Sequence, residues 1–372
     1  MKVCFRVDAS IEIGTGHVMR CLTLAEALRK KGVECSFLCR PHTGNLIEFI
    51  RSKNFHVYPL GKTPAPEDTS IEPLEVEDNT ALYATWLGCN WETDAQESGY
   101  HLQNIDPDWL VVDHYALDQR WELALKAWYK KLAVIDDLAD RVHASDFLLD
   151  QTLGRNQKEY AELVPKECDL LLGAQYALLR PEFARWREYS LKRRSPPQLN
   201  QILITLGGVD KNNATGQILN ALAQSGLSEH CKITVIMGST APHLEDIQSL
   251  AKTLPWQTEV KINVSNMAEL MANSDLAIGA AGGTSWERCC LGLPTLMVVL
   301  AENQSKIARA LADAEAAILL GRENDILGEL GNRMNLLLNE SILSRMSRAA
   351  FSLNDGGGLD LVVSYLVGEA YE

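Results

Sequence analysis

The chain has 372 residues, of which 46% are hydrophobic and 23% charged, and its formal net charge at pH 7 is −14. This length favours two domains, and the composition is typical of a soluble globular protein. The negative charge argues against nucleic acid as a partner, because binding to phosphate backbones requires basic surface. It does not exclude a small anionic ligand, since glycine loops and helix amino ends bind phosphate without net positive charge.

The segment that begins at Met1 runs directly into an apolar strand pattern without the features of a signal peptide. No apolar run approaches the roughly 20 residues that a membrane span needs, so a cytoplasmic protein without a membrane partner is expected. The nine cysteines include no Cys-x-x-Cys pair and predict reduced thiols, and the eight histidines lack metal-ligand spacing. We therefore expect neither a metal nor a cofactor. The sequence leaves the oligomeric state open, with a monomer favoured.

The first 31 residues predict a strand, a glycine turn and a helix. Apolar and polar residues alternate from Val3 to Val7, and Asp8 falls at the carboxyl end of this strand. The Gly14-Thr15-Gly16 turn allows a tight backbone path, and a helix with one apolar face follows it. Ligands of open α/β sheets bind at this edge of the sheet.

His17 therefore lies in the first turn of a helix at the ligand-binding edge, with Arg20 one turn further on. The positive end of the helix dipole disfavours imidazolium, so we expect a neutral imidazole that can accept a proton as a general base. The alternative is that the glycines only shape the turn and His17 contacts backbone.

Strand and helix patterns alternate through the first half, which predicts a parallel sheet. Strands are expected at 33–39, 56–60, 108–113, 132–135 and 147–150, the last closing this half. Residues 61–80, rich in Pro, Glu, Asp and Thr, are expected to form a surface excursion. One rim should collect the polar residues at the strand ends, namely Asp8, His17, Asp113, His114, Tyr115, Asp136 and Asp137. For each carboxylate alone, capping of a following turn is an alternative role.

The second half restarts the same pattern after a linker at 191–200, whose basic run we interpret as a solvated tether. Strands are expected at 201–206, 232–237, 259–263, 275–279 and 295–300, the last clear one. The fold class is α/β, with two Rossmann-like open parallel-sheet domains at 1–190 and 201–340 that face each other across a cleft. Residues 341–372 should form a helical tail that packs back toward the N-terminal domain.

A strand leads into Ala281, Gly282, Gly283, Thr284 and Ser285, and a helix carrying Glu287 follows. Backbone amides beside such glycines can approach a diphosphate, although a purely structural turn is an equal alternative. Gly207-Gly208 and Asn303-Gln304 lie at two other strand ends of this half. A histidine on one half and a phosphate cradle on the other imply a reaction in the cleft between them.

These residues resemble a known family. The two open-sheet domains and the glycine loop look like the GT-B fold of nucleotide-sugar enzymes. Within it, residues 13–21, 111–115, 176–180, 205–208 and 302–304 resemble the UDP-sugar hydrolases of bacterial pseudaminic acid biosynthesis. The matching blocks spread over most of residues 1–310, whereas 61–105 and the tail after 340 match poorly.

The resemblance implies metal-free hydrolysis of UDP-2,4-diacetamido-2,4,6-trideoxy-β-L-altropyranose to UDP and the free sugar, with inversion. It implies His17 as the base, with Tyr115 and Asn303 shaping the water and sugar site. The substrate-binding residues expected beside them are Asp8, Gly14, Thr15, Gly16, Arg20, Asp113, His114, Gly207, Gly208, Met267, Ala281, Gly282, Gly283, Thr284, Ser285, Glu287 and Gln304. Alternatives are a glycosyltransferase that uses a UDP-amino sugar donor, a catalytically silent nucleotide-sugar binder, and a 2-epimerase.

Overall fold

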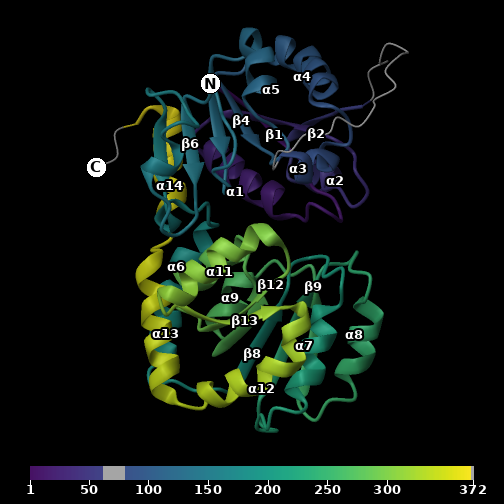
Figure 1. The fold of residues 1–372 in the computed structure, drawn as a ribbon, viewed down its shortest axis with the longest axis vertical. Helices are drawn as coiled ribbons and strands as arrows, with labels where there is room; N and C mark the ends of the chain where they lie inside the picture. The colour runs from purple at the N-terminus through teal and green to yellow at the C-terminus, as the bar shows by residue number, and fades with distance from the viewer. Residues whose placement is uncertain (62–79, 370–372) are drawn as a thin grey trace. The chain divides into compact units, whose positions relative to one another are not determined.

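A computed structural model describes residues 1–61 and 80–369. Its internal contacts divide the chain into two compact units (Figure 1). Unit 1 comprises Met1–Gln151, Arg155–Leu178 and Asp360–Glu372, and unit 2 comprises Thr152–Gly154 and Leu179–Leu359. The acidic excursion expected at 61–80 lies, except for its two end residues, outside the described residues.

Unit 1 is built on a seven-stranded parallel sheet with the order β3-β2-β1-β4-β5-β6-β7. The strands are β1 (Lys2–Val7), β2 (Glu34–Cys39), β3 (His56–Pro59), β4 (Trp109–Asp113), β5 (Lys131–Ile135), β6 (Phe147–Asp150) and β7 (Asp169–Leu172). The helices are α1 (Gly16–Lys30), α2 (Ile47–Ser52), α3 (Thr80–Leu87), α4 (Trp91–Ile105), α5 (Gln119–Ala124) and α14 (Gly358–Val367), with 3₁₀ turns η1 (Lys126–Trp128), η2 (Gln157–Tyr160) and η3 (Ala174–Tyr176).

Unit 2 is a six-stranded parallel sheet with the order β10-β9-β8-β11-β12-β13, which is the strand order of a Rossmann fold. The strands are β8 (Gln201–Thr205), β9 (Lys232–Met237), β10 (Gln257–Ile262), β11 (Leu276–Ala280), β12 (Thr295–Val299) and β13 (Ala317–Arg322). The helices are α6 (Pro181–Arg193), α7 (Ala214–Leu222), α8 (Leu244–Ala251), α9 (Met267–Ala272), α10 (Thr284–Cys290), α11 (Ser305–Asp313), α12 (Ile326–Leu337) and α13 (Glu340–Leu353), with 3₁₀ turns η4 (Glu302–Gln304) and η5 (Glu323–Asp325).

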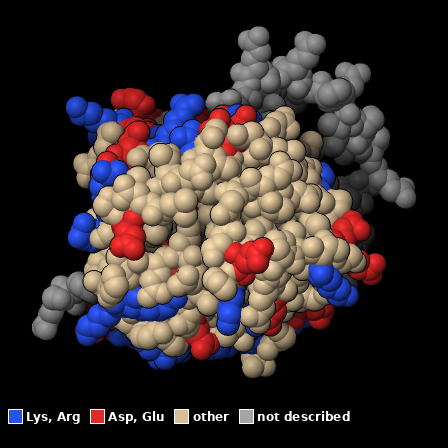
Figure 2. Space-filling view, turned by 90° about the horizontal axis from the view of Figure 1, so that it is seen from below, with Lys and Arg blue, Asp and Glu red and all other residues tan. Residues whose placement is uncertain are grey.

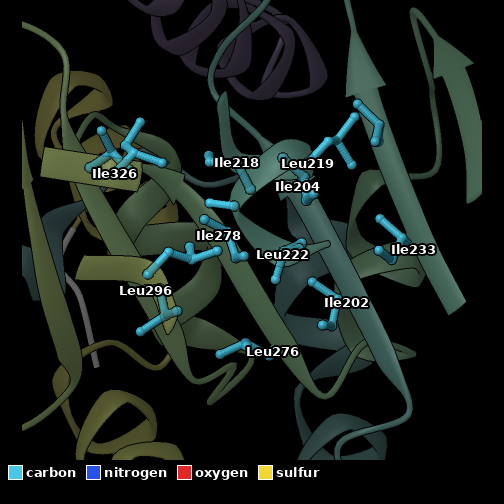
Figure 3. Packing of buried hydrophobic residues seen from close by; sticks show 14 of the residues in the cluster. Ile202, Ile204, Ile218, Leu219, Leu222, Ile233, Leu276, Ile278, Leu296 and Ile326 are labelled. Atoms are coloured by element: carbon cyan, nitrogen blue, oxygen red, sulfur yellow. The ribbon is translucent and has the colours of Figure 1, made fainter. Parts of the chain in front are cut away.

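The core of unit 2 forms where one face of the sheet meets its helices. Ile202, Ile278 and Leu296 project from β8, β11 and β12 toward Leu219 and Leu222 of α7 (Figure 3). All five side chains are fully buried or nearly so. Their burial fixes the central strands, and with them the loops that leave the carboxyl ends of those strands.

The sequence analysis missed two strands, β7 and β13, and each lies at the edge of its sheet. β7 has four residues, and the three leucines in it are only half-buried. β13 pairs with β12 through a register shift at Met297/Val298. The first half therefore does not close at residue 150, and 295–300 is not the last strand. Short edge strands carry little periodic signal because one side of each has no partner strand.

The expectation of a solvated tether at 191–200 is also wrong at Arg193 and Arg194, whereas Lys192 is exposed. Helix α6 continues to Arg193, which pairs with Asp275 at 2.6 Å. Arg194 is 7% exposed and donates to the backbone carbonyls of Met271, Ser274 and Leu291. Carbonyls at helix ends attract cations, so these arginines anchor the segment to unit 2.

The C-terminal helix α14 packs within unit 1, where it lies beside β6 (Figure 1). The indole N–H of Trp109 donates to the carbonyl of Leu366 over 3.1 Å, and the rings of Phe147 and Tyr365 stack at 4.5 Å. Helix α13 packs on α10 in unit 2. The segment at 341–372 is thus shared between the two units.

Each sheet contains one point where the strand order reverses. In unit 1 the chain moves outward from β1 in one direction and from β4 in the other, and β8 and β11 have the same relation in unit 2. Loops at the carboxyl ends of such strand pairs diverge and leave room for ligands. The two reversal points therefore locate the candidate sites.

The visible face in Figure 2 shows Lys and Arg interspersed with Asp and Glu.

Among the helices of the described residues, none has both the length and the apolar character required to cross a membrane.

Candidate functional site

The reversal point of unit 1 brings His17 and Asp113 into contact. His17 lies in the first turn of α1, and Asp113 is the last residue of β4, paired in register with Val7 of β1. The Nδ1 atom of His17 lies 2.6 Å from Oδ1 of Asp113. The end of β4 and the start of α1, which are distant in sequence, thus bring a carboxylate and a histidine together at the ligand-binding edge.

Arg20 clamps this pair from the next turn of α1. Its Nη2 and Nε atoms donate to Oδ1 and Oδ2 of Asp113, each over 2.7 Å, and its Nη1 donates to Asp137 over 2.7 Å. Burial alone would raise the pKa of Asp113, but Arg20 and His17 hold it well below its ordinary value. An ionised Asp113 accepts a hydrogen bond from the Nδ1–H group of His17, so Nε2 is the ring nitrogen left to accept a proton.

Tyr115 completes the cluster two residues beyond β4. Its hydroxyl donates to Oδ2 of Asp137 over 2.9 Å, and its ring meets that of His17 edge-on at 4.7 Å. Burial, together with the negative charge of Asp137, raises the pKa of Tyr115 well above its ordinary value. The side chain is therefore a neutral phenol.

Two aromatic residues from α3 contact Tyr115, and the sequence analysis did not single them out. Trp86 stacks on it at 5.8 Å and Tyr83 meets it edge-on at 5.2 Å. The Tyr-x-x-Trp spacing, which puts both rings on one helix face, was a usable signal for the aromatic pair.

The sequence analysis expected Asp137 on the rim but gave it no role in the site.

Asp8 and His114 have interior partners. Asp8 is 1% exposed, lies 2.8 Å from Nη1 of Arg6, and accepts the backbone N–H of Arg40 over 2.6 Å. The Nε2 atom of His114, which is 4% exposed, lies 3.4 Å from Asp8. The contacts of both side chains thus lie in a buried charge network that continues through Arg6 to Asp94. Their assignment to substrate binding stays a prediction.

The glycine turn before His17 has the expected shape. Gly14 has a φ of +78° and donates its N–H to Ser10, while Gly16 is exposed and a Cβ there would meet nothing. The carbonyl of Thr15 accepts the N–H of Met19, which begins the α1 ladder.

In unit 2, the loop after β11 presents open backbone. A Cβ at either Gly282 or Gly283 would meet no atom within 4 Å. Within the described part of the chain, the N–H groups of Gly282, Gly283 and Thr284 have no acceptor, whereas that of Ala281 donates to Val298. Helix α10 has only seven residues, so these amides, more than a long helix dipole, can bind an anion here.

Glu287 lies one turn into α10. Its side chain is 17% exposed, and Oε1 lies 3.8 Å from Nη2 of Arg180. Burial raises the pKa of Glu287 to about 7, against the lowering influence of Arg180 and Arg288. This carboxyl can therefore both donate and accept hydrogen bonds near neutral pH.

The remaining expected residues of unit 2 lie at neighbouring strand ends. Gly207 has a φ of +90° with open space at its Cβ position, and the carbonyl of Gly208 accepts the N–H of Gly238 over 2.9 Å. Ser285 is 1% exposed and accepts from Arg288. Gln304 accepts the backbone N–H of Leu300 through its side chain. Half-buried Met267 and Asn303 lie at the start of α9 and in η4.

In the part of the chain that the structure describes, no group of three or more His, Cys, Asp or Glu side chains is arranged to hold a metal ion.

Comparison with known proteins bears on both units. Residues 202–355 match the family described as glycosyltransferase family 28 C-terminal domain. Over 318 residues the chain is 28% identical to UDP-2,4-diacetamido-2,4,6-trideoxy-beta-L-altropyranose hydrolase of Campylobacter jejuni, covering 84% of this chain and 96% of that protein. It is also 26% identical over 310 residues to an uncharacterized protein of Methanocaldococcus jannaschii, covering 82% of this chain but only 56% of that protein's length.

Among solved structures, MurG of Acinetobacter baumannii superposes with a TM-score of 0.67, 19% identity and 99% coverage of both chains. UDP-GlcNAc 2-epimerase from Neisseria meningitidis gives a TM-score of 0.59 at 13% identity, covering 99% of this chain and 100% of that one. Likeness at such low identity establishes the fold. The chain is thus an α/β protein of the GT-B fold whose residues 202–355 match the glycosyltransferase family 28 C-terminal domain, and it is similar in sequence, over most of its length, to the altropyranose hydrolase of Campylobacter jejuni.

Proposed function

We propose that this protein hydrolyses UDP-2,4-diacetamido-2,4,6-trideoxy-β-L-altropyranose to UDP and the free sugar, a step of pseudaminic acid biosynthesis. The observation that carries the proposal is the His17–Asp113 pair at the strand-order reversal of unit 1. It occurs in a chain similar over 84% of its length to a hydrolase named for this substrate.

The chemistry assigned to unit 1 is activation of water. Nε2 of His17 accepts a proton from water as the water oxygen attacks the anomeric carbon, while Asp113 stabilises the imidazolium that forms. The anomeric C–O bond breaks and its electron pair leaves with the UDP oxygen. Attack from the face opposite the leaving group inverts the configuration. Tyr115 and Asn303 are proposed to orient the water and the sugar.

The chemistry assigned to unit 2 is binding of UDP. The N–H groups of Gly282, Gly283 and Thr284 are proposed to bind the diphosphate and stabilise the charge that develops on it as it leaves. Glu287 would bind the ribose hydroxyls, and the backbone beside Met267 would contact uracil. This scheme requires no metal ion.

Hydrolysis in ¹⁸O-labelled water tests the proposal. The UDP-linked diacetamido sugar is incubated with the protein, and both products are analysed by mass spectrometry. The label is expected on the sugar. Label on UDP would mean attack at phosphorus, and the absence of turnover with this substrate would refute the assigned activity.

A second candidate function is glycosyl transfer to an acceptor other than water. It is favoured by the family 28 C-terminal domain and by 29% identity over 185 residues to a processive diacylglycerol beta-glucosyltransferase of Bacillus pumilus. A transferase would release UDP only when an acceptor is added. Release of UDP at the same rate with and without an added acceptor would exclude glycosyl transfer.

A further inference from the structure

Arg288 is a buried cation in α10 that contacts no carboxylate among the described residues. It is 1% exposed, and Nη2 donates to the carbonyl of Ala280 over 2.7 Å and to Oγ of Ser285 over 3.0 Å. Nη1 lies 3.2 Å from Oγ1 of Thr284. Within the described residues Arg288 forms no ion pair, and its Nε has no hydrogen-bond partner. The three residues that it hydrogen-bonds are electrically neutral, and the carboxyl of Glu287, whose pKa Arg288 lowers, is not among its hydrogen-bond or ion-pair partners.

Buried charges in proteins are ordinarily paired, because desolvation of an unpaired charge is costly. The other buried arginines of this chain illustrate the usual arrangement. Arg6 lies between the carboxylates of Asp8 and Asp94. Among the described residues Arg194 contacts no carboxylate either, but its Nε, Nη1 and Nη2 atoms all donate to carbonyls near helix ends. Arg288 instead has a single carbonyl acceptor, that of Ala280, beside two hydroxyl partners, and its Nε has no partner.

The sheet leaves room for this charge. A Cβ at Gly279 of β11 would lie 2.6 Å from Nη1 of Arg288, so the guanidinium occupies space that only a glycine leaves free. Burial lowers the pKa of Arg288 to about 10, which still keeps the side chain charged at neutral pH. A permanent positive charge is therefore built in beneath the loop that follows β11.

The atoms that Arg288 holds flank the open glycines of that loop. Ala280 precedes Gly282 and Gly283, and Thr284 and Ser285 follow them. We propose that Arg288 is a positioning residue that holds this loop in shape, and that its charge is the built-in counter-charge for the diphosphate of a nucleoside diphosphate bound by the loop amides. This inference rests on the proposed binding of UDP by unit 2.

The test compares a charged ligand with an uncharged one. UDP binding is measured by calorimetry, and uridine binding by saturation-transfer NMR, which detects millimolar affinities. Arg288→Met keeps the bulk and removes the charge. It should weaken UDP binding about tenfold to a hundredfold while uridine affinity stays within about twofold of wild type. Arg288→Lys should restore part of the UDP affinity.

A structural role alone predicts a different pattern. If Arg288 only maintains the fold, Arg288→Met lowers the melting temperature and weakens UDP and uridine by the same factor. An unchanged UDP-to-uridine affinity ratio in the variant overturns the inference.

Gly279→Ala gives an independent variant, since its methyl group must displace the Arg288 guanidinium. It should lower the ratio of UDP affinity to uridine affinity, as Arg288→Met does. Arg345→Met, on an exposed part of α13, makes the same change in net charge and should leave the ratio unchanged. Loss of UDP binding in wild type would refute the proposed function itself, whereas normal UDP binding with unchanged ratios in both variants refutes this inference alone.

Discussion

Nδ1 of His17 lies 2.6 Å from Oδ1 of Asp113, and both Asp113 oxygens also accept hydrogen bonds from Arg20. The carboxylate is thus fixed from two sides and cannot rotate away from the imidazole. A histidine whose Nδ1–H is held by a carboxylate has its other nitrogen, Nε2, available for proton transfer. This relationship gives His17 a defined tautomer as well as a position.

The first prediction concerns His17. His17→Ala should lower turnover by ~10²–10⁴-fold, the usual contribution of a general base, because the water loses its proton acceptor. Calorimetric UDP affinity should persist, since the UDP-binding residues proposed here lie in unit 2. His230→Ala, at an exposed position of unit 2, is the control. Turnover near wild type in His17→Ala would remove the histidine from the mechanism.

The second prediction concerns Asp113. Asp113→Asn keeps the shape but removes the charge that orients His17 and stabilises its protonated form, so turnover should fall by about 10²-fold or more. Asp360→Asn, at an exposed position of α14, should leave turnover unchanged. An Asp113→Asn enzyme as fast as wild type would mean that the contact has no catalytic consequence.

The third prediction follows from the raised pKa of Glu287. Burial lifts it from the ordinary value of 4.5 to about 7, so the folded state holds this proton more tightly than the unfolded state does. The resulting stability is fully present below pH 4.5 and is lost as the pH rises through about 7. Relative to Glu287→Gln, the free energy of unfolding of wild type should fall by up to about 3 kcal/mol between pH 4.5 and 8.

Urea unfolding of both proteins at closely spaced pH values measures this difference. Charge effects elsewhere in the chain are common to the two proteins and cancel in the comparison. Parallel stability curves across this pH range would show that Glu287 ionises at its ordinary pKa.

The fourth prediction concerns the open glycines. The methyl group of Gly282→Ala would enter free space, so the fold should tolerate it, but it would occupy the room through which a diphosphate approaches the loop amides. UDP affinity should fall about tenfold with little change in melting temperature. Gly328→Ala, also with open space at its Cβ position, lies inside α12 and should raise stability by about 0.5–1 kcal/mol without affecting UDP. Equal UDP affinity in both variants would place the diphosphate elsewhere.

The alternation of strand and helix patterns predicted two parallel sheets, and the structure confirms them. It also placed His17, Asp113 and the glycine loop at strand ends, because period-two alternation and glycine turns are local signals. The edge strands β7 and β13 were missed, since half-buried short strands lack that periodicity. Helix α3, which carries Trp86, lies within residues 61–105, which match the family poorly.

The sequence by itself determined which side chains stand at the ends of strands. Only the tertiary structure decided which strand ends are neighbours, because pairing of β1 with β4 and of β8 with β11 depends on contacts between residues far apart in the chain. It likewise decided which charges are buried. In the sequence, Arg194 and Arg288 look like ordinary polar positions of a linker and a helix. They become buried, and acquire their hydrogen-bond partners, only when distant segments pack around them.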